Sequence, residues 1–118
     1  MEMTESWPPQ WLRGPLPLCV LHAVEREAAH GYAIATRLEE MGLGSVGGGT
    51  LYPILNRLQR DGYLTAEWMA GEGGPGRKVY ALTGDGASEL AAQAQRWRDF
   101  AATTSQALAP GNEKEGNR

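Results

Sequence analysis

Two groups of polar and cationic side chains in the middle of the chain have the types and spacing to bind a polyanion. The first group lies on a predicted helix that follows the turn of residues 45–49 and ends at Gly62, and its aliphatic residues recur at i, i+3, i+4 and i+7 and form one buried stripe. These aliphatic residues are Leu51, Ile54, Leu55 and Leu58. The opposite face carries side chains that donate hydrogen bonds, stack or bear charge: Tyr52, Asn56, Gln59 and Arg60, with Pro53 and Arg57 at its border. A helix with such a face fits the major groove of DNA.

The second group lies beside a glycine-rich turn. Gly62 is expected to end the helix, because glycine tolerates the left-handed conformation of a C-terminal cap. Residues 63–69 alternate and are rich in strand formers, the glycines and proline of residues 71–76 predict a reversal, and residues 78–82 form a return strand. Arg77 and Lys78 therefore flank the tip of a β-hairpin. A short helix followed by a basic hairpin is typical of a winged helix, in which the hairpin lies along phosphates.

We expect the DNA contacts to come from ten residues of these two groups: Thr50, Tyr52, Pro53, Asn56, Arg57, Arg60, Gly74, Gly76, Arg77 and Lys78. Asn56 has the donor and acceptor to pair with adenine, and Tyr52 is expected to contact a phosphate. Other roles stay open for some positions. Thr50 can equally assist the helix start, and Arg57 and Arg60 can be solvated charges, although we expect one of the two arginines to contact a phosphate.

Two earlier helices are expected to support this unit. One begins near residues 15–17, where prolines suit a first turn. The other covers residues 31–41, is capped by His30, and directs five side chains inward: Tyr32, Ile34, Ala35, Leu38 and Met41. Gly47 is a weak N-cap for the helix that follows, and Pro53 is expected close enough to its start for the missing N–H to cost little.

These elements predict a mainly α fold with a small β-hairpin wing, an α+β arrangement. We expect a flexible arm over residues 1–10, a winged helix-turn-helix over residues 11–82, a helix over residues 83–108 and a disordered tail over residues 109–118. In the last helix, seam residues step alternately by three and four over three heptads, which favours dimerisation. The expected interface residues are Leu90, Ala94, Trp97, Ala101 and Leu108.

The net charge is unusual for a nucleic-acid-binding protein. The chain carries 11 basic and 14 acidic residues, which gives a formal charge of −3. DNA-binding proteins are usually basic, since phosphate neutralisation supplies much of their affinity. The excess of acid lies in residues 1–44, however, and residues 45–80 have a balance of +1. This distribution permits DNA binding and predicts modest non-specific affinity.

Several other functions have no support in the sequence. Cys19 is the only cysteine, so an internal disulfide and a cysteine-based zinc site are excluded. The two histidines lack a carboxylate at metal-ligand spacing, and no nucleophile–base pair or phosphate-binding loop is present. We therefore expect no enzyme activity, cofactor or metal. The apolar runs are too short for a membrane helix and no signal peptide is recognisable, so a cytoplasmic location is expected.

The motifs HGY at 30–32, GTLYPIL at 49–55, RLQRDGYL at 57–64 and GRKVYALT at 76–83, together with Trp97, resemble the PadR family of bacterial transcriptional regulators. The resemblance covers approximately residues 12–108, with the motifs in the same order and at the same spacing. It implies a dimeric regulator, most simply a repressor, that places two recognition helices in successive major grooves of a palindromic operator.

The resemblance also implies a small aromatic effector. In some multidrug-responsive members, a tryptophan at the position of Trp97 lines a pore between subunits and stacks on flat aromatic drugs. By this resemblance Trp97, together with Trp11 or Trp7, is a candidate effector site, and the alternative role of Trp97 is in the dimer core. A different alternative for the whole chain, motivated by its net charge, is a winged-helix module that binds proteins and not DNA.

Overall fold

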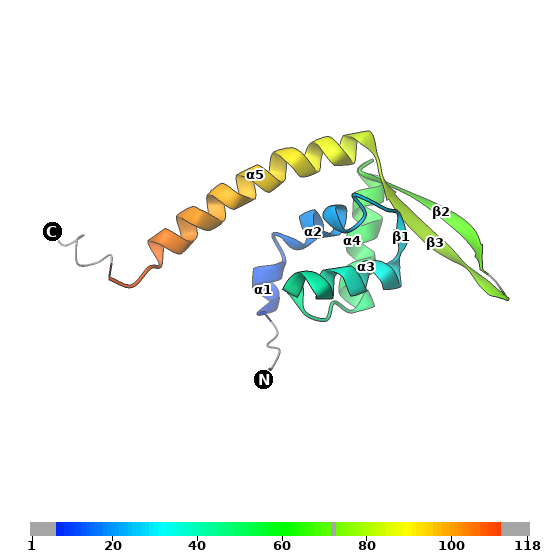
Figure 1. Cartoon of the computed structure of the whole chain (residues 1–118), viewed down its shortest axis with the longest axis horizontal. Coiled ribbons are helices and arrows are strands. Elements are labelled where there is room, and N and C mark those ends of the chain that lie inside the picture. Colours follow the sequence, from blue (N-terminus) through cyan, green and yellow to red (C-terminus); the bar gives the residue numbers. More distant parts are fainter. Residues whose placement is uncertain (1–6, 72, 112–118) are drawn as a thin grey trace.

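The computed structural model describes residues 7–71 and 73–111. Their elements follow in the order α1 (Pro9–Leu12), α2 (Leu16–Ala23), β1 (Ala29–His30), α3 (Gly31–Leu38), η1 (Glu39–Leu43), α4 (Gly48–Arg60), β2 (Leu64–Gly71), β3 (Gly74–Leu82) and α5 (Gly84–Ala107). Figure 1 shows α2, α3 and α4 gathered into one body, with the β2–β3 hairpin projecting from it and α5 passing over α2. The predicted α+β class, a winged helix followed by a long helix, is confirmed.

The helices are held together by aliphatic side chains from one face of each. The buried stripe of α4 consists of Leu51, Leu55 and Leu58, while Ile54 lies at its edge and is only partly buried. It packs with buried residues of α2 and α3: Leu16, Val20, Leu21, Ile34 and Leu38. Since burying an aliphatic side chain contributes about 1.5–3 kcal/mol, this packing fixes the orientation of α4 and leaves its polar face outside.

The hairpin belongs to a three-stranded antiparallel sheet with the order β1-β3-β2. The short strand β1 was not predicted; it pairs Ala29 with Tyr80 and His30 with Val79. In the hairpin, Leu64 pairs with Leu82 and the pairing continues to Gly71 and Gly74 through an irregularity after Met69. The strands are therefore longer than expected, and β1 ties the start of α3 directly to the wing.

The base of the wing is tied to the ends of α4 and α5. Gly62 follows α4 with a φ of 86°, as expected for its helix-ending role. The Thr83 hydroxyl donates to the Gly62 carbonyl at 2.7 Å and accepts from the Gly86 N–H at 2.9 Å, which makes Thr83 the N-cap of α5. The Tyr63 N–H donates to the Leu58 carbonyl at 2.9 Å. These contacts fix where the wing leaves the helical body.

Several expectations are wrong in detail. Pro9 and Gln10 belong to α1 and not to a flexible arm, and the Trp7 indole N–H donates to the Gly42 carbonyl at 2.8 Å. Residues 109–111 of the predicted tail are described and follow the end of α5 in a turn. The remaining predictions for the arm and the tail concern residues 1–6 and 112–118, which lie outside the described residues. Tyr32 and Met41 are exposed and not inward-facing. Tyr32 lies on the side of α3 opposite Ile34, and the wider turn η1 breaks the 3.6-residue spacing before Met41.

The position of Pro53 also differs from the prediction. Helix α4 begins at Gly48 after an N-cap glycine with no side-chain hydrogen bond, which confirms the weak cap. Pro53 is consequently the sixth helical residue and lies inside the helix. Its missing N–H removes the bond that would otherwise reach the Gly49 carbonyl, since each helical N–H bonds four residues back.

The first turn of α5 provides a matched pair of glycines for a stability test. A Cβ at Gly86 would collide with the Tyr63 carbonyl oxygen and lie 2.8 Å from a Leu82 methyl carbon, whereas a Cβ at Gly84 would meet nothing within 4 Å. We predict that Gly86→Ala lowers the free energy of unfolding by about 1–3 kcal/mol through overpacking. Gly84→Ala should leave it unchanged or raise it by up to about 1 kcal/mol. Chemical denaturation measures both, and equal values for the two variants would contradict this packing.

Candidate nucleic-acid interface

The outward side of α4 has two flanks that face different parts of the molecule. The helix has 13 residues, so it is about 20 Å long. Tyr52 and Asn56 lie on the flank that faces β1 and the wing. Thr50 and Arg57 lie on the other flank, which faces α1. The most outward part between the two flanks includes Pro53 and Arg60, both of which are exposed.

A groove of about 460 Å³ separates α4 from the wing. Ten residues line it: His30, Gly31, Tyr32, Tyr52, Asn56, Trp68, Gly76, Arg77, Lys78 and Tyr80. Five of the ten predicted DNA-binding residues therefore meet at this groove. Its lining carries two permanent cations and no carboxylate, which is the charge pattern expected for a site that receives an anion.

Tyr52 is held in the groove by its contact with Gly31. A Cβ at Gly31 would lie 2.8 and 2.9 Å from the Cζ and Cε1 atoms of Tyr52, so the ring occupies the space that a side chain would fill. Below it, Tyr80 is buried, and burial, with a smaller contribution from Tyr52, raises the pKa of Tyr80 above its usual value. The glycine of the HGY motif thus lets the outer end of Tyr52 lie against the start of α3 while the side chain stays half-exposed.

The cations of the wing have aromatic and polar neighbours. Lys78 lies opposite Trp68 in the hairpin, and its Nζ is 5.8 Å from the centre of the Tyr80 ring. Trp68 is 71% exposed and was not among the predicted site residues. The Arg77 Nη1 lies 2.8 Å from the His30 Nε2. His30 was predicted only as a helix cap, because its contact with Arg77 depends on the unpredicted pairing of β1 with β3.

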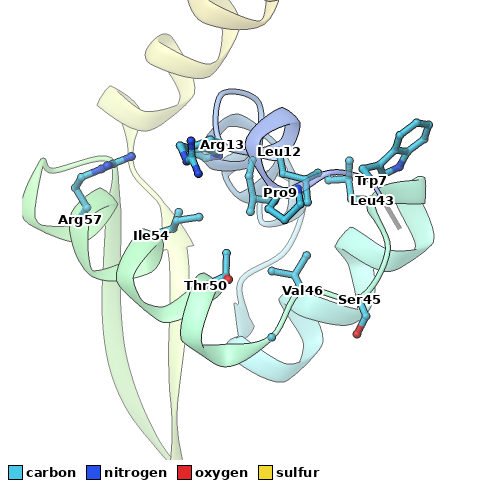
Figure 2. A pocket seen from close by; sticks show the side chains of 13 residues that line it. Trp7, Pro9, Leu12, Arg13, Leu43, Ser45, Val46, Thr50, Ile54 and Arg57 are labelled. Atoms are coloured by element: carbon cyan, nitrogen blue, oxygen red, sulfur yellow. The ribbon is translucent and has the colours of Figure 1, made fainter. Parts of the chain in front are cut away.

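The other flank of α4 borders a second hollow, of about 500 Å³, between α4, α1 and the turn after η1. Figure 2 shows Arg57 and Trp7 at opposite ends of it, with Thr50, Ile54 and Val46 between them. Thr50 and Arg57 are thus separated from the groove that holds Tyr52 and Arg77. Of the remaining predicted residues, Pro53, Arg60 and Gly74 are exposed and line neither hollow.

Packing of α5 against its own subunit divides the predicted dimer seam into a covered part and an exposed part. Leu90 is only 6% exposed and Ala94 packs against the core of its own chain, so their own subunit already covers both side chains. Trp97 lies against Gly14, with its Cζ3 3.2 Å from the Cβ position of that glycine. This placement leaves Leu90 little exposed surface for a second copy, and its role in a dimer interface stays a prediction. Ala101 and Leu108 lie farther along α5, beyond these contacts with α2.

A shallow hollow of about 470 Å³ lies beside Trp97. It is lined by Gly14, Pro17, Leu18, Gln93, Arg96, Trp97 and Phe100. Trp11, the second candidate for effector binding, is not among these residues. Its ring instead lies 6.3 Å from that of Trp7, so one subunit does not bring Trp11 and Trp97 together in this hollow.

No group of three or more histidine, cysteine or acidic side chains with metal-binding geometry occurs within residues 7–71 and 73–111. Burial raises the pKa of the Cys19 thiol, which disfavours the reactive thiolate. None of the helices in this part of the chain is long and apolar enough to span a membrane.

A family model described as the transcriptional regulator PadR-like family matches residues 20–92. The chain belongs to the PadR family. This is a family of transcriptional regulators and not of enzymes. A transcriptional regulator of Mycobacterium tuberculosis is 35% identical over 81 residues, which cover 69% of this chain and 74% of that protein.

Solved structures of PadR-like proteins share this fold. A PadR-like transcription factor from Bacteroides fragilis is 36% identical, with a TM-score of 0.71 over 85% of this chain and 96% of the other. A PadR family regulator from Eggerthella lenta is 32% identical, with a TM-score of 0.77 over 87% and 89%. PadR of Bacillus subtilis, solved in complex with operator DNA, is 26% identical, with a TM-score of 0.62 over 70% of this chain and 47% of that one.

The contact between Tyr52 and Gly31 gives a test of the groove. We predict that Gly31→Ala displaces the Tyr52 ring but changes the free energy of unfolding by no more than about 1 kcal/mol, because only the end of a half-exposed side chain must move. Aromatic NMR signals of Tyr52 and thermal unfolding report the two effects. Gly48→Ala is the control, since its Cβ would meet the same ring at 3.4 Å, an ordinary contact distance. Unmoved Tyr52 signals in Gly31→Ala would contradict this geometry.

Proposed function

We propose that the chain binds double-stranded DNA as a dimer and represses transcription from a palindromic operator. The observation that carries this proposal is the groove between α4 and the wing, where Tyr52, Asn56, Arg77 and Lys78 converge without a carboxylate among the lining residues. An outward helix about 20 Å long fits the major groove, and a basic hairpin beside it reaches the adjacent phosphates. The Bacillus subtilis relative was solved in complex with operator DNA, which supports DNA binding by this chain.

The contacts divide by chemistry. Asn56 is placed to read a base edge, since its amide can donate to and accept from adenine. Tyr52, Arg77 and Lys78, together with one of Arg57 and Arg60, contact phosphates and set the position of α4 without reading sequence. The hydroxyl of Thr50 reaches a phosphate or assists the start of α4, Pro53 contacts the DNA on the outward side of α4, and Gly74 and Gly76 let the wing backbone approach the DNA. In a bacterial-type cell this activity belongs to the cytoplasm.

We predict that Arg77→Ala and Lys78→Ala each weaken operator binding and reduce the slope of log K against log salt by about 0.9, the contribution of one neutralised phosphate. Fluorescence anisotropy at several salt concentrations measures both quantities. Arg26→Ala is the control, because Arg26 is exposed, carries the same charge and lines a different hollow, bordered by α2 and α3. Equal salt slopes for the two wing variants and the parent protein would show that the wing does not contact DNA phosphates.

The same measurements separate this function from protein binding by a winged-helix module, the alternative that the net charge of −3 favours. A protein-binding module predicts that neither Arg77→Ala nor Tyr52→Ala changes its activity. A DNA-binding regulator predicts that both variants lose operator affinity. Repression is tested by a reporter fused to the bound promoter: its output should fall when the chain is produced, and a rise would identify an activator.

We propose that dimerisation uses the part of α5 beyond its contacts with α2. Helix α5 has 24 residues, and Figure 1 shows its second half extending past the helical body. Phe100 and Leu108 are 59% and 76% exposed on this part, and Ala101 lies between them. Trp97 is mostly covered by its own subunit and offers its remaining exposed part to a partner. Two such helices packed along the seam would cover these apolar side chains and set the separation of the two α4 helices at about one DNA turn.

Ala101 and Ala102 form a matched pair for testing the seam, because they are adjacent on α5 but about 100° apart around the helix. We predict that Ala101→Glu converts the dimer to a monomer, since it places a carboxylate in the seam, whereas Ala102→Glu leaves the dimer intact. Light scattering coupled to size exclusion measures the mass of each variant. A dimeric Ala101→Glu protein would exclude this seam.

We further propose that a flat aromatic effector binds beside Trp97 and releases the protein from DNA. The hollow that contains Trp97 and Phe100 supports this site, and Trp11 can contribute only from the partner subunit or after a rearrangement. Planar aromatic compounds should quench tryptophan emission, and Trp97→Ala should abolish the quenching, with Trp68→Ala as the control on the wing. Quenching that persists without Trp97 would exclude Trp97 as the effector site.

A further inference from the structure

His30 faces two hydrogen-bond donors at the junction of β1, α3 and the wing. The Ala33 N–H donates to its Nδ1 at 3.3 Å, which caps α3. The Arg77 Nη1, a permanent donor, lies 2.8 Å from its Nε2. A neutral imidazole has one acceptor nitrogen and one N–H, and a protonated imidazole has no acceptor. His30 therefore cannot accept from Ala33 and from Arg77 at the same time.

Each tautomer of His30 leaves one group without a partner. With hydrogen on Nδ1, His30 accepts from Arg77 and the cap on α3 is lost. With hydrogen on Nε2, the cap is kept and two donors, the Nε2–H and the Arg77 guanidinium, point at one another. A single anionic oxygen between or beside them would accept from both, and charge-assisted hydrogen bonds of this kind are the stronger ones.

The surroundings favour an external anion as that acceptor. Within the described residues the ion pairs are His22 with Glu25 and Arg37 with Glu27, and neither involves Arg77. The pairing of Glu67 with Val79, and of Val79 with His30, places Glu67 on the same face of the sheet as His30 and Arg77 and on the strand next to Arg77, but no ion pair joins Glu67 to Arg77 among the described residues. His30 and Arg77 both line the groove beside α4, with Lys78 as a further cation.

We propose that His30 and Arg77 together bind one phosphodiester group of the DNA backbone, with His30 as the Nε2–H tautomer. This inference rests on the proposed function and adds a residue to its interface. Binding of the phosphate resolves the conflict at His30, because the phosphate accepts from Nε2 and Arg77 while Nδ1 keeps its bond to Ala33. Bound phosphate favours the tautomer that caps α3, so the DNA contact and the order of α3 reinforce one another.

Two amide substitutions separate the capping role of His30 from its phosphate contact. Asparagine places an acceptor near the Nδ1 position and is a preferred N-cap, but it has no donor at the Nε2 position. Glutamine places an amide donor near the Nε2 position and is a poor cap. His30→Asn should keep the melting temperature of the parent and lose about tenfold in operator affinity, the effect of one hydrogen bond to a charged group. His30→Gln should melt lower and keep most of the affinity.

Salt dependence distinguishes this contact from that of Arg77. The neutral His30 displaces no counterion, so His30→Asn should keep the salt slope of the parent while Arg77→Ala reduces it. His22→Asn is the matched control, because His22 is the only other histidine, is exposed on α2 and pairs with Glu25. It should change neither affinity nor slope.

The tautomer of His30 can be observed directly by NMR. Long-range proton–nitrogen NMR spectra of the protein bound to a short operator duplex should show hydrogen on Nε2 and a free Nδ1 for His30, with His22 as the internal reference. Hydrogen on Nδ1 of bound His30, or equal operator affinities for the parent and His30→Asn, would overturn the inference and leave the proposed function intact. Failure of the parent protein itself to bind its operator would overturn the proposed function, and this inference with it.

Discussion

Burial of the aliphatic stripe of α4 is the constraint on which the rest of the structure depends. Because Leu51, Leu55 and Leu58 must face the core, Tyr52 and Asn56 lie on the flank toward the wing and Arg57 lies on the flank toward α1. A rotation of α4 that brought its polar face inward would bury uncompensated polar groups and expose the leucines, at a cost of several kcal/mol. The identity of the outward surface is therefore a consequence of core packing.

The position of the wing follows from the same helix. The chain leaves α4 through Gly62, and hydrogen bonds from Tyr63 and Thr83 close the base of the hairpin against the end of α4. Strand β1 then joins the hairpin to the start of α3. Two cations of the wing are thereby placed beside α4 in a chain whose net charge is negative. The local arrangement of charge, and not its total, decides what the groove can bind.

Much of the helical framework was predictable from the sequence, because helix positions and ends depend on the pattern of neighbouring residues. The periodicity of α4 and the helix end at Gly62 follow from neighbouring residues. Features that depend on contacts distant in sequence were missed. Pairing of β1 with β3 brings His30 to Arg77, and packing of α5 on α2 buries Leu90, a residue that a heptad pattern assigns to a dimer. A heptad seam of small residues does not by itself show which of its residues pack on their own subunit and which face a second copy.

The central claim is that the groove and the outward face of α4 read DNA. The most direct test is a salt-dependent binding titration of the purified protein with DNA from the region upstream of its own gene, against a scrambled duplex of equal length and composition. The account predicts tight binding to the upstream DNA that weakens as salt rises, and far weaker binding to the scrambled duplex. Equal and feeble binding to both would contradict it, and would favour a winged-helix module that binds a protein.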